Sequence, residues 1–172
     1  MKNILTAILL MSCFSSLFAQ KNAELQTVAH VDLTRYLGKW YDIASFPQRF
    51  QKGCSCTTAE YALKDNGTIT VTNTCNKEGK KKVATAKAKV VDKKTNAKLS
   101  VQFFWPFKGK YWIIDLADDY SYAVVGHPNR EYLWILSRTK EMDKATYDGI
   151  LARIKEKGFD LSKLQKTVQS CE

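Results

Sequence analysis

The sequence has only two histidines, His30 and His127, and it lacks a glycine-rich phosphate-binding loop. An enzyme that uses acid–base or nucleophilic chemistry needs several reactive groups close together, and no histidine cluster supplies them. The Cys-x-Cys pair at 54–56 does not match the spacing of zinc ligands. The adjacent aspartates at 118–119 are better explained as turn residues. These absences predict a protein that is not an enzyme and that uses no cofactor and no metal.

The apolar run near the N-terminus, residues 4–11, is too short to span a bilayer. Together with the lysine before it and the small residues up to Ala19, it predicts a signal peptide over residues 1–19. A second possibility is lipidation, because Leu10-Met11-Ser12-Cys13 resembles the lipobox of bacterial lipoproteins, in which Cys13 becomes the first mature residue. We therefore expect an exported protein that is periplasmic or secreted, or alternatively a lipoprotein anchored in the outer membrane.

The rest of the chain has room for one domain, because 172 residues hold one sizeable core and no stretch resembles a long linker. We expect a flexible lead over residues 20–30 and a single domain over residues 31–172. The formal net charge is +10, but the lysines are scattered through strands and turns, so we attribute the charge to solubility. No basic groove studded with aromatic residues is evident, so nucleic acid is not an expected partner.

Four of the five cysteines follow the predicted signal peptide: Cys54, Cys56, Cys75 and Cys171. An even number of cysteines in an exported chain predicts two disulfides. Three pairings are possible. The expected pairing of neighbouring strands leaves Cys75 within reach of either Cys54 or Cys56, so it does not choose between them.

Eight short segments rich in apolar residues, separated by turn residues, predict eight β-strands. They cover residues 39–46, 56–63, 68–75, 82–92, 97–105, 110–116, 120–126 and 131–138. The strongest turn signal is Asp65-Asn66-Gly67, because Asn and Gly tolerate the positive backbone angles of tight hairpins. Strands at this regular spacing predict an all-β fold, an eight-stranded up-and-down antiparallel β-barrel whose closure removes both sheet edges.

Pairing the strands outward from their turns gives one apolar interior face. The predicted pairs are Trp134 with Ala123, Val125 with Trp112, Trp112 with Phe103, Val101 with Ala88, and Leu99 with Val90. On one side of this interior the side chains are mostly alanines, and they lie opposite large aromatic side chains. Because alanine side chains are small, we expect space for one small ligand and not a completely filled core. The predicted ligand-binding residues are Val90, Leu99, Val101, Phe103, Trp112, Ile114, Ala123, Val125, Tyr132 and Trp134.

The outer face is apolar only on the first strand and the last two, so that part of it needs a cover. A helix beginning after Asp143 provides one, because Tyr147, Ile150 and Ile154 recur at helical spacing. Gly158 suits a left-handed C-terminal cap. We predict one C-terminal α-helix packed outside the barrel.

The first and last strands are expected to meet at one end of the barrel. Gly38 permits a sharp turn ahead of Trp40, and Arg138 ends the last strand. We predict that the Arg138 guanidinium stacks on the Trp40 indole and donates its remaining hydrogen bonds to carbonyls of residues 31–35.

These residues carry a family resemblance. Gly38-x-Trp40, Asp119-Tyr120 and Arg138 match conserved blocks of the lipocalins, in which they are structural residues that close the barrel. The chain is identified as a member of that family, and residues 38–44, 103–107 and 132–139 resemble its bacterial lipocalin and apolipoprotein D branch.

The resemblance implies a calyx that carries a fatty acid, lysophospholipid or similar amphiphile outside the cytoplasm, as a monomer or weak dimer, for lipid transport or envelope maintenance. Cys56 matches the apolipoprotein D cysteine that bonds the C-terminal tail, which implies the pairs Cys56–Cys171 and Cys54–Cys75. Two alternatives stay open. One is a lipocalin-fold enzyme with a free interior cysteine, against which the even cysteine count argues. The other is a structural protein with a self-filled barrel whose basic loops contact a membrane surface.

Overall fold

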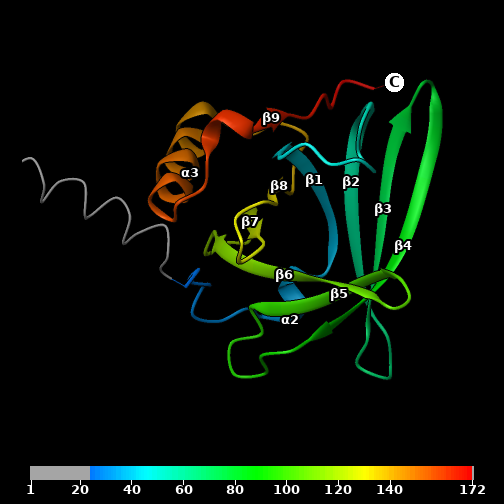
Figure 1. The fold of residues 1–172 in the computed structure, drawn as a ribbon, viewed down its shortest axis with the longest axis vertical. Coiled ribbons are helices and arrows are strands. Elements are labelled where there is room, and N and C mark those ends of the chain that lie inside the picture. Colours follow the sequence, from blue (N-terminus) through cyan, green and yellow to red (C-terminus); the bar gives the residue numbers. More distant parts are fainter. Residues whose placement is uncertain (1–23, 172) are drawn as a thin grey trace, which may run out of the picture.

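The main body of the protein is a closed β-barrel, seen in a computed structural model that describes residues 24–171 (Figure 1). Its eight antiparallel strands are β1 (Gly38–Ser45), β2 (Cys54–Leu63), β3 (Ile69–Lys77), β4 (Lys80–Val90), β5 (Lys98–Phe104), β6 (Phe107–Leu116), β7 (Tyr122–Gly126) and β8 (Leu133–Ser137). Each strand pairs with the next along the chain, and β1 pairs with both β8 and β2. The predicted eight-stranded up-and-down barrel is confirmed.

The two ends of the barrel differ. One end is covered by the short helix α2 (Leu33–Tyr36), which is capped by the side chain of Asp32, and we call it the closed end. The opposite end carries the β1–β2 loop (46–53) and the connections at 78–79, 105–106 and 127–132, and we call it the open end. A short strand that the sequence did not predict, β9 (Gln165–Lys166), pairs with Ala44 and Ser45 of β1.

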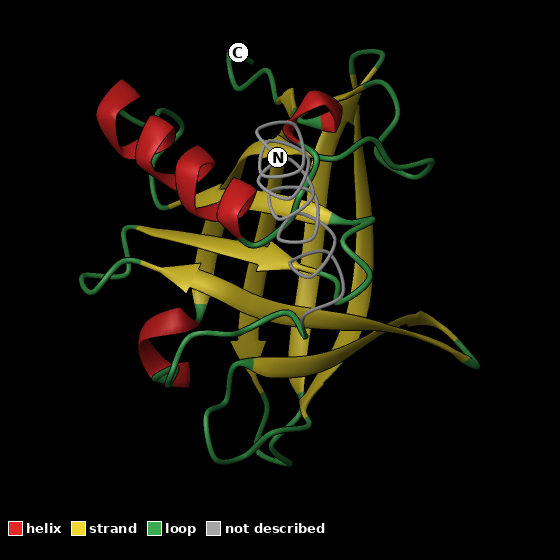
Figure 2. Cartoon of the chain, turned by 60° about the vertical axis from the view of Figure 1, so that its left-hand side comes forward, coloured by secondary structure: helices red, strands yellow, loops and turns green. Residues whose placement is uncertain are grey.

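The predicted C-terminal helix is α3 (Lys144–Glu156), and it lies against the outside of the barrel wall (Figure 2). The Asp143 side chain accepts a hydrogen bond from the Thr146 amide at 2.8 Å, as expected for an N-cap. Gly158 has φ +83°, and the next amide, that of Phe159, donates to the Ile154 carbonyl at 3.1 Å. The helix therefore ends with a left-handed residue that turns Phe159 back onto the barrel.

The buried apolar side chains form two clusters. The interior cluster lies inside the barrel. It consists of Val31, Tyr36, Trp40, Tyr61, Ile69, Val71, Ala86, Ala88, Ala97, Leu99, Ile113, Ala123, Val125 and Leu136. The outer cluster lies between the barrel and α3 and consists of Leu25, Ala44, Phe46, Ile114, Val124, Leu133, Ile135, Ile150, Ile154 and Phe159.

The strand register confirms part of the sequence pairing and corrects the rest. Val101 faces Ala88 and Leu99 faces Val90, as predicted. Between β5 and β6, however, Trp112 faces Lys98 and not Phe103, because the pairing is irregular between Val101 and Phe104.

The β6–β7 pairing has a second irregularity, between Ile113 and Asp115, and it sets Val125 opposite Ile113. Each bulge shifts the alternation by an odd number of residues, which moves side chains to the other face. The predicted inward orientation of Trp112 and Ile114 was therefore wrong: Ile114 belongs to the outer cluster, and Trp112 packs against it. On β8, Trp134 faces Val125 and Leu136 faces Ala123, two residues from the predicted register but on the same face.

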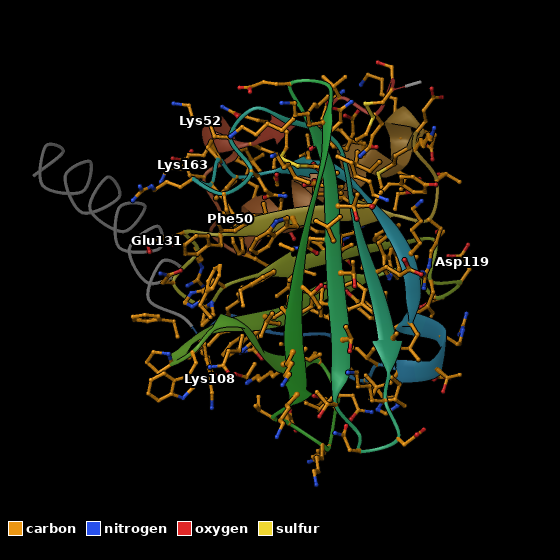
Figure 3. The ribbon with its side chains drawn as sticks, turned by 90° about the vertical axis from the view of Figure 1, so that its right-hand side faces the viewer. Phe50, Lys52, Lys108, Asp119, Glu131 and Lys163 are labelled. Carbon is orange, nitrogen blue, oxygen red and sulfur yellow. A yellow bond between two sulfur atoms is a disulfide. The ribbon has the colours of Figure 1, made fainter. Side chains whose placement is uncertain are left out.

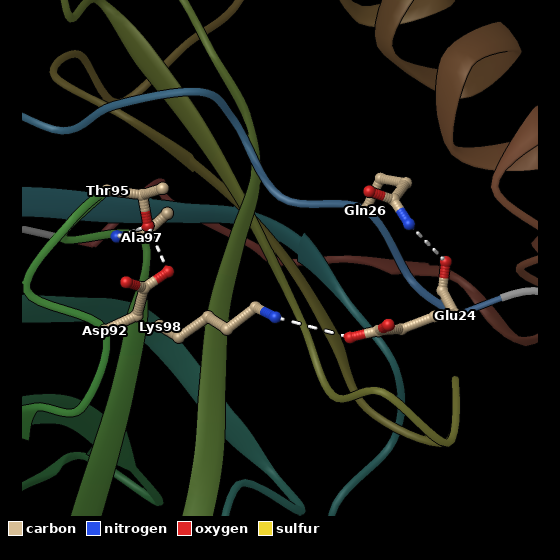
Figure 4. Close-up of polar contacts among 6 residues, drawn as sticks. All are labelled: Glu24, Gln26, Asp92, Thr95, Ala97 and Lys98. Carbon is tan, nitrogen blue, oxygen red and sulfur yellow. Dashed lines mark hydrogen bonds and ion pairs between the residues drawn. The ribbon is translucent and has the colours of Figure 1, made fainter.

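The start of the described chain lies along the barrel. Leu25 is buried in the outer cluster, and the Val28 amide donates to the Ile113 carbonyl at 3.0 Å. Glu24 forms an ion pair with Lys98 at 3.4 Å, close to the β4–β5 loop where Thr95 donates to Asp92 (Figure 4). Residues 24–30, expected to form a flexible lead, thus have several anchors.

The predicted signal peptide and the lipidation candidate Cys13 lie outside the described residues. Among the helices of residues 24–171, none has the length and apolar character needed to cross a membrane.

Candidate functional site

The closed end is held by Arg138. Its guanidinium carbon lies 3.6 Å from the centroid of the Trp40 ring, and its terminal nitrogens donate to the carbonyls of Lys39 at 2.8 Å and Arg35 at 2.6 Å. A further bond reaches the Leu37 carbonyl at 3.0 Å. Arg35 is the last residue of the predicted range 31–35, and Leu37 and Lys39 lie just after it. The contact joins the end of β8 to the start of β1, so it closes the barrel where the sequence placed it.

The β6–β7 turn adds to this closure. The Asp119 carboxylate accepts a hydrogen bond from the Ser121 amide at 2.9 Å, and Tyr120, with φ +63°, accepts a bond from the Asp32 amide at its hydroxyl, at 2.8 Å. The Arg35 guanidinium lies 4.1 Å from the Tyr120 ring centroid. All five predicted structural residues, Gly38, Trp40, Asp119, Tyr120 and Arg138, are therefore at the closed end.

Three tyrosines form the floor of the interior. The Tyr111 hydroxyl is bonded to those of Tyr36 at 2.6 Å and Tyr61 at 2.8 Å. Burial raises the pKa of Tyr61 to about 12 and raises the pKa values of Tyr36 and Tyr111 well above the usual value. The cluster therefore stays protonated and neutral at physiological pH, so the floor is uncharged but retains polar hydroxyls.

Exposure increases from this floor toward the open end. Trp40 and Leu99 are 0% and 2% exposed, whereas Val101 and Trp134 are only half-buried. Phe103, two positions beyond Val101 on β5, is 36% exposed. The apolar side chains near the open end are thus more exposed to solvent than those near the floor. This geometry suits an apolar ligand entering from the open end.

A ring stack and a hydrogen-bonded bridge line one side of this mouth. Tyr132 is stacked on Trp134, with ring centroids 6.3 Å apart and an angle of 13° between the planes. The Trp134 indole donates to the Gln51 side-chain oxygen at 3.3 Å, and the Gln51 amide nitrogen donates to the Asp42 carboxylate at 3.2 Å. The β1–β2 loop is therefore connected to the interior through Gln51.

Asp42 is a buried carboxylate, 3% exposed, beside a cavity of about 530 Å³ under the β1–β2 loop. Its Oδ1 has no hydrogen-bond partner among the described residues. Burial raises the pKa of Asp42 from 3.8 to about 6. Side-chain hydrogen bonding by Ser45, Thr167 and Gln51 lowers this pKa, but by less than burial raises it. The charge of this group therefore changes near neutral pH.

The structure contains the disulfides Cys54–Cys75 and Cys56–Cys171, the pairing that the resemblance implied. The first joins β2 to β3 beside the β1–β2 loop, and the second ties the C-terminal segment to β2. Both lie toward the open end, so they fix the base of the loop that Gln51 belongs to.

Eight of the ten predicted ligand-binding residues lie in the interior or at its mouth. Val90, Leu99, Val101, Ala123, Val125 and Trp134 belong to the interior cluster or pack on it, and Phe103 and Tyr132 lie at the open end. Trp112 and Ile114 are on the outside. The interior positions that the sequence reasoning missed are Tyr61, Ile69, Val71, Tyr111 and Ile113. The alternation of Ile69 and Val71 with Thr70 and Thr72 on β3 was a signal that could have identified these two.

Metal-ligand clusters and free thiols are both absent from residues 24–171. Among residues 24–171, no group of three or more histidine, cysteine or acidic side chains is placed to hold a metal ion. All four cysteines of this range are in disulfides. A nucleophilic interior thiol is therefore absent from the described barrel.

Comparison with known proteins gives consistent results. A lipocalin-like domain model matches residues 31–169. Temperature-induced lipocalin-1 of Arabidopsis thaliana is 42% identical over 156 residues, covering 86% of this chain and 84% of the relative. Outer membrane lipoprotein Blc of Vibrio cholerae is 38% identical over 164 residues, covering 94% and 93%. Apolipoprotein D of Macaca fascicularis is 34% identical over 148 residues, covering 80% of this chain and 77% of the relative.

Solved structures with lower sequence identity have the same fold. Insecticyanin from the tobacco hornworm Manduca sexta superposes with a TM-score of 0.69 at 22% identity, covering 84% of each chain.

Proposed function

The chain belongs to the lipocalin family, and on that premise we propose that it is an exported carrier that holds a fatty acid, lysophospholipid or similar amphiphile in its barrel. The family is one of generally non-enzymatic binding proteins, and a small hydrophobic ligand is what its fold implies. The proposal of an acyl-chain ligand rests mainly on the increase in exposure toward the open end, from buried Leu99 to half-buried Trp134 and partly exposed Phe103.

The chemistry of the lining supports this ligand class. The aliphatic and aromatic walls match an acyl chain, which gains free energy in proportion to the apolar area that it buries. The floor of the interior is uncharged, because its three tyrosines stay protonated. A polar head group would then stay at the mouth, where Trp134, Gln51 and solvent are available.

Two features support export. Disulfides persist in oxidising compartments and are rare in the cytosol. Several relatives carry the name outer membrane lipoprotein. We therefore place the protein outside the cytoplasm, as a periplasmic or secreted protein or as a lipoprotein anchored through Cys13.

Titration of the delipidated protein with a fluorescent fatty acid tests the proposal, with tryptophan quenching as the readout. We expect saturable binding of one ligand per chain. The Trp134→Ala variant should bind on the order of tenfold more weakly, because it loses an aromatic wall of the pocket.

The matched control is Trp112→Ala, since Trp112 lies on the outside with its ring centroid 4.2 Å from the Lys98 amine. This variant should keep the parent affinity even if its stability falls. No quenching at micromolar fatty acid, or equal loss of affinity in the two variants, would refute the pocket assignment.

A further inference from the structure

The cavity under the β1–β2 loop is separate from the barrel interior. Its lining comes from the end of β1, the β1–β2 loop, the start of β2 and the segment around β9, and none of these residues belongs to the interior cluster. Figure 3 shows Lys52 of this loop on the opposite side of the molecule from Asp119 of the closed end. The volume of about 530 Å³ lies within the range of about 300–1,000 Å³ that is typical of small-molecule sites. The cavity therefore has room for an organic molecule besides a ligand of the barrel.

The walls of this cavity are held in place by hydrogen bonds and disulfides. The Thr167 amide donates to the Ile43 carbonyl at 3.0 Å. The side-chain nitrogen of Gln169 donates to the carbonyls of Asp42 at 2.7 Å and Thr57 at 2.9 Å. The two disulfides fix the base of the loop and the C-terminal segment that lies across it. A cavity whose walls are fixed in this way is preformed, as small-molecule sites usually are.

Two buried polar side chains in the lining have unused hydrogen-bonding atoms. Asp42 is 3% exposed and Gln48 is 8% exposed. Within the described part of the chain, the Oδ1 atom of Asp42 and both side-chain polar atoms of Gln48 lack a hydrogen-bond partner. Buried polar atoms are nearly always bonded, because leaving them unpaired costs free energy. Two such side chains around one cavity indicate a polar ligand.

The charges around the cavity are arranged by depth. Among the described residues that line it, Asp42 is the only acidic one, and it is buried. Arg49, Lys52 and Lys166 also line the cavity, but these basic residues are exposed. A negative group at depth and positive groups near solvent are complementary to a ligand that carries both charges.

We propose that this cavity binds a small zwitterion through its primary ammonium group. The ammonium group donates hydrogen bonds to Asp42 Oδ1 and to the side-chain oxygen of Gln48, and the anionic group faces the basic residues. A trimethylammonium group fits less well, because it has no N–H to donate to these acceptors. A metal ion also fits less well, since one carboxylate lines the cavity and residues 24–171 hold no cluster of three or more metal-ligating side chains.

The energetic state of Asp42 supports this site. Burial raises the pKa of its carboxyl to about 6, so its charged form is disfavoured in the free protein. A bound ammonium group would provide the missing opposite charge. A side chain that lowers stability is expected where it has a function, because stability and function often conflict at binding sites.

Isothermal titration calorimetry of the purified protein at pH 7.5 tests the proposal, with phosphoethanolamine as the probe and phosphocholine as its matched ligand. We expect one phosphoethanolamine to bind per chain and phosphocholine to bind on the order of tenfold more weakly. Asp42→Asn should weaken phosphoethanolamine binding by the same order, because a hydrogen bond to a charged group is lost. Asparagine keeps the shape of the side chain and can still accept the Gln51 bond, so this variant should fold.

Control variants separate the two ends of the ligand. Arg49→Gln with Lys52→Gln should weaken phosphoethanolamine binding severalfold but leave the binding of ethanolamine, which has no anionic group, unchanged. Lys93→Gln with Lys94→Gln removes two exposed charges from the β4–β5 loop and should leave both ligands unaffected. Asp65→Asn, at an exposed carboxylate, should also bind as the parent does.

The same zwitterion can come from a free solute or from the head group of a lysophospholipid. For a free solute, phosphoethanolamine should bind equally well to protein that is saturated with fatty acid. For a head group, lysophosphatidylethanolamine should displace a fluorescent fatty acid better than lysophosphatidylcholine does, and Asp42→Asn should abolish that difference. Either result supports the site and identifies the source of its ligand.

Three results would overturn the inference. They are the absence of any preference for the ethanolamine compound over the choline compound, an unchanged affinity in Asp42→Asn, and equal competition by sodium ions, which would indicate a plain cation site. The inference does not depend on the carrier proposal. Phosphoethanolamine binding that requires Asp42, without fatty-acid binding, would remove the carrier proposal alone. Fatty-acid binding without any ammonium binding that requires Asp42 would remove this inference alone.

Discussion

Replacing Asp42 with asparagine should stabilise the protein at neutral pH. Asp42 is 3% exposed, and its Oδ1 has no hydrogen-bond partner among the described residues. Burial raises the pKa of its carboxyl from 3.8 to about 6. Because the folded state binds this proton more tightly than the unfolded chain, the contribution of Asp42 to stability is greatest below pH 3.8 and is lost as the pH rises through about 6.

The size of the effect follows from the shift. A change in pKa of about two units corresponds to about 3 kcal/mol of unfolding free energy once the pH is above both values. Asparagine cannot ionise, it has nearly the same shape, and its oxygen can still accept the Gln51 bond. Asp42→Asn should therefore gain about 3 kcal/mol at pH 7.5, roughly half of that at pH 5, and almost nothing near pH 3.

Urea denaturation followed by tryptophan fluorescence, at several pH values, measures this gain. Asp65→Asn is the matched control, because Asp65 is exposed in the β2–β3 turn, and it should leave the unfolding free energy nearly unchanged. If Asp42→Asn gave the same gain at pH 7.5 and pH 4, or a loss at pH 7.5, the buried carboxylate would not have the proposed energetic role.

Three further changes test the packing. Gly126→Ala places a Cβ 2.7 Å from the buried ring of Phe159 and should cost about 1–3 kcal/mol by thermal or urea unfolding, whereas Gly109→Ala, whose Cβ meets only a backbone oxygen at 3.8 Å, should be nearly neutral. Arg138→Met removes the stacking on Trp40 and several carbonyl bonds, so it should lower the unfolding free energy by about 2–4 kcal/mol and change fatty-acid affinity less than twofold. Paired cysteine-to-serine replacement of the disulfide with a sequence separation of 115 should cost about 1.5 kcal/mol more than replacement of the one with a separation of 21. Equal costs for the two glycine variants or for the two disulfide variants would contradict the contact and loop arguments, and an unchanged unfolding free energy for Arg138→Met would contradict the closure argument.

The sequence was sufficient to predict the barrel and the contacts at its closed end. It was not sufficient to predict which residues of every strand face the interior. Gly38, Trp40 and Arg138 are linked by local geometry, since a turn, a strand start and a strand end determine where they meet. The β4–β5 register was also correct, because alternating alanines and lysines on β4 leave only one possible interior face. Strand β6 is different: Tyr111 to Ile114 are four consecutive apolar residues, so alternation cannot choose a face, and two bulges decided it.

The correction on β6 changes how the two sides of the barrel relate to function. Trp112 and Ile114 connect the wall to the outer cluster under α3, whereas Tyr111 and Ile113 of the same strand face the interior. Adjacent residues of this one strand therefore pack on the helix side and on the interior side of the wall. The mouth has no such support from α3, since exposed side chains there, such as Phe103, belong to neither buried cluster. Under the carrier proposal, the ligand would therefore enter where exposed side chains lie outside both buried clusters, as expected where local opening needs little free energy.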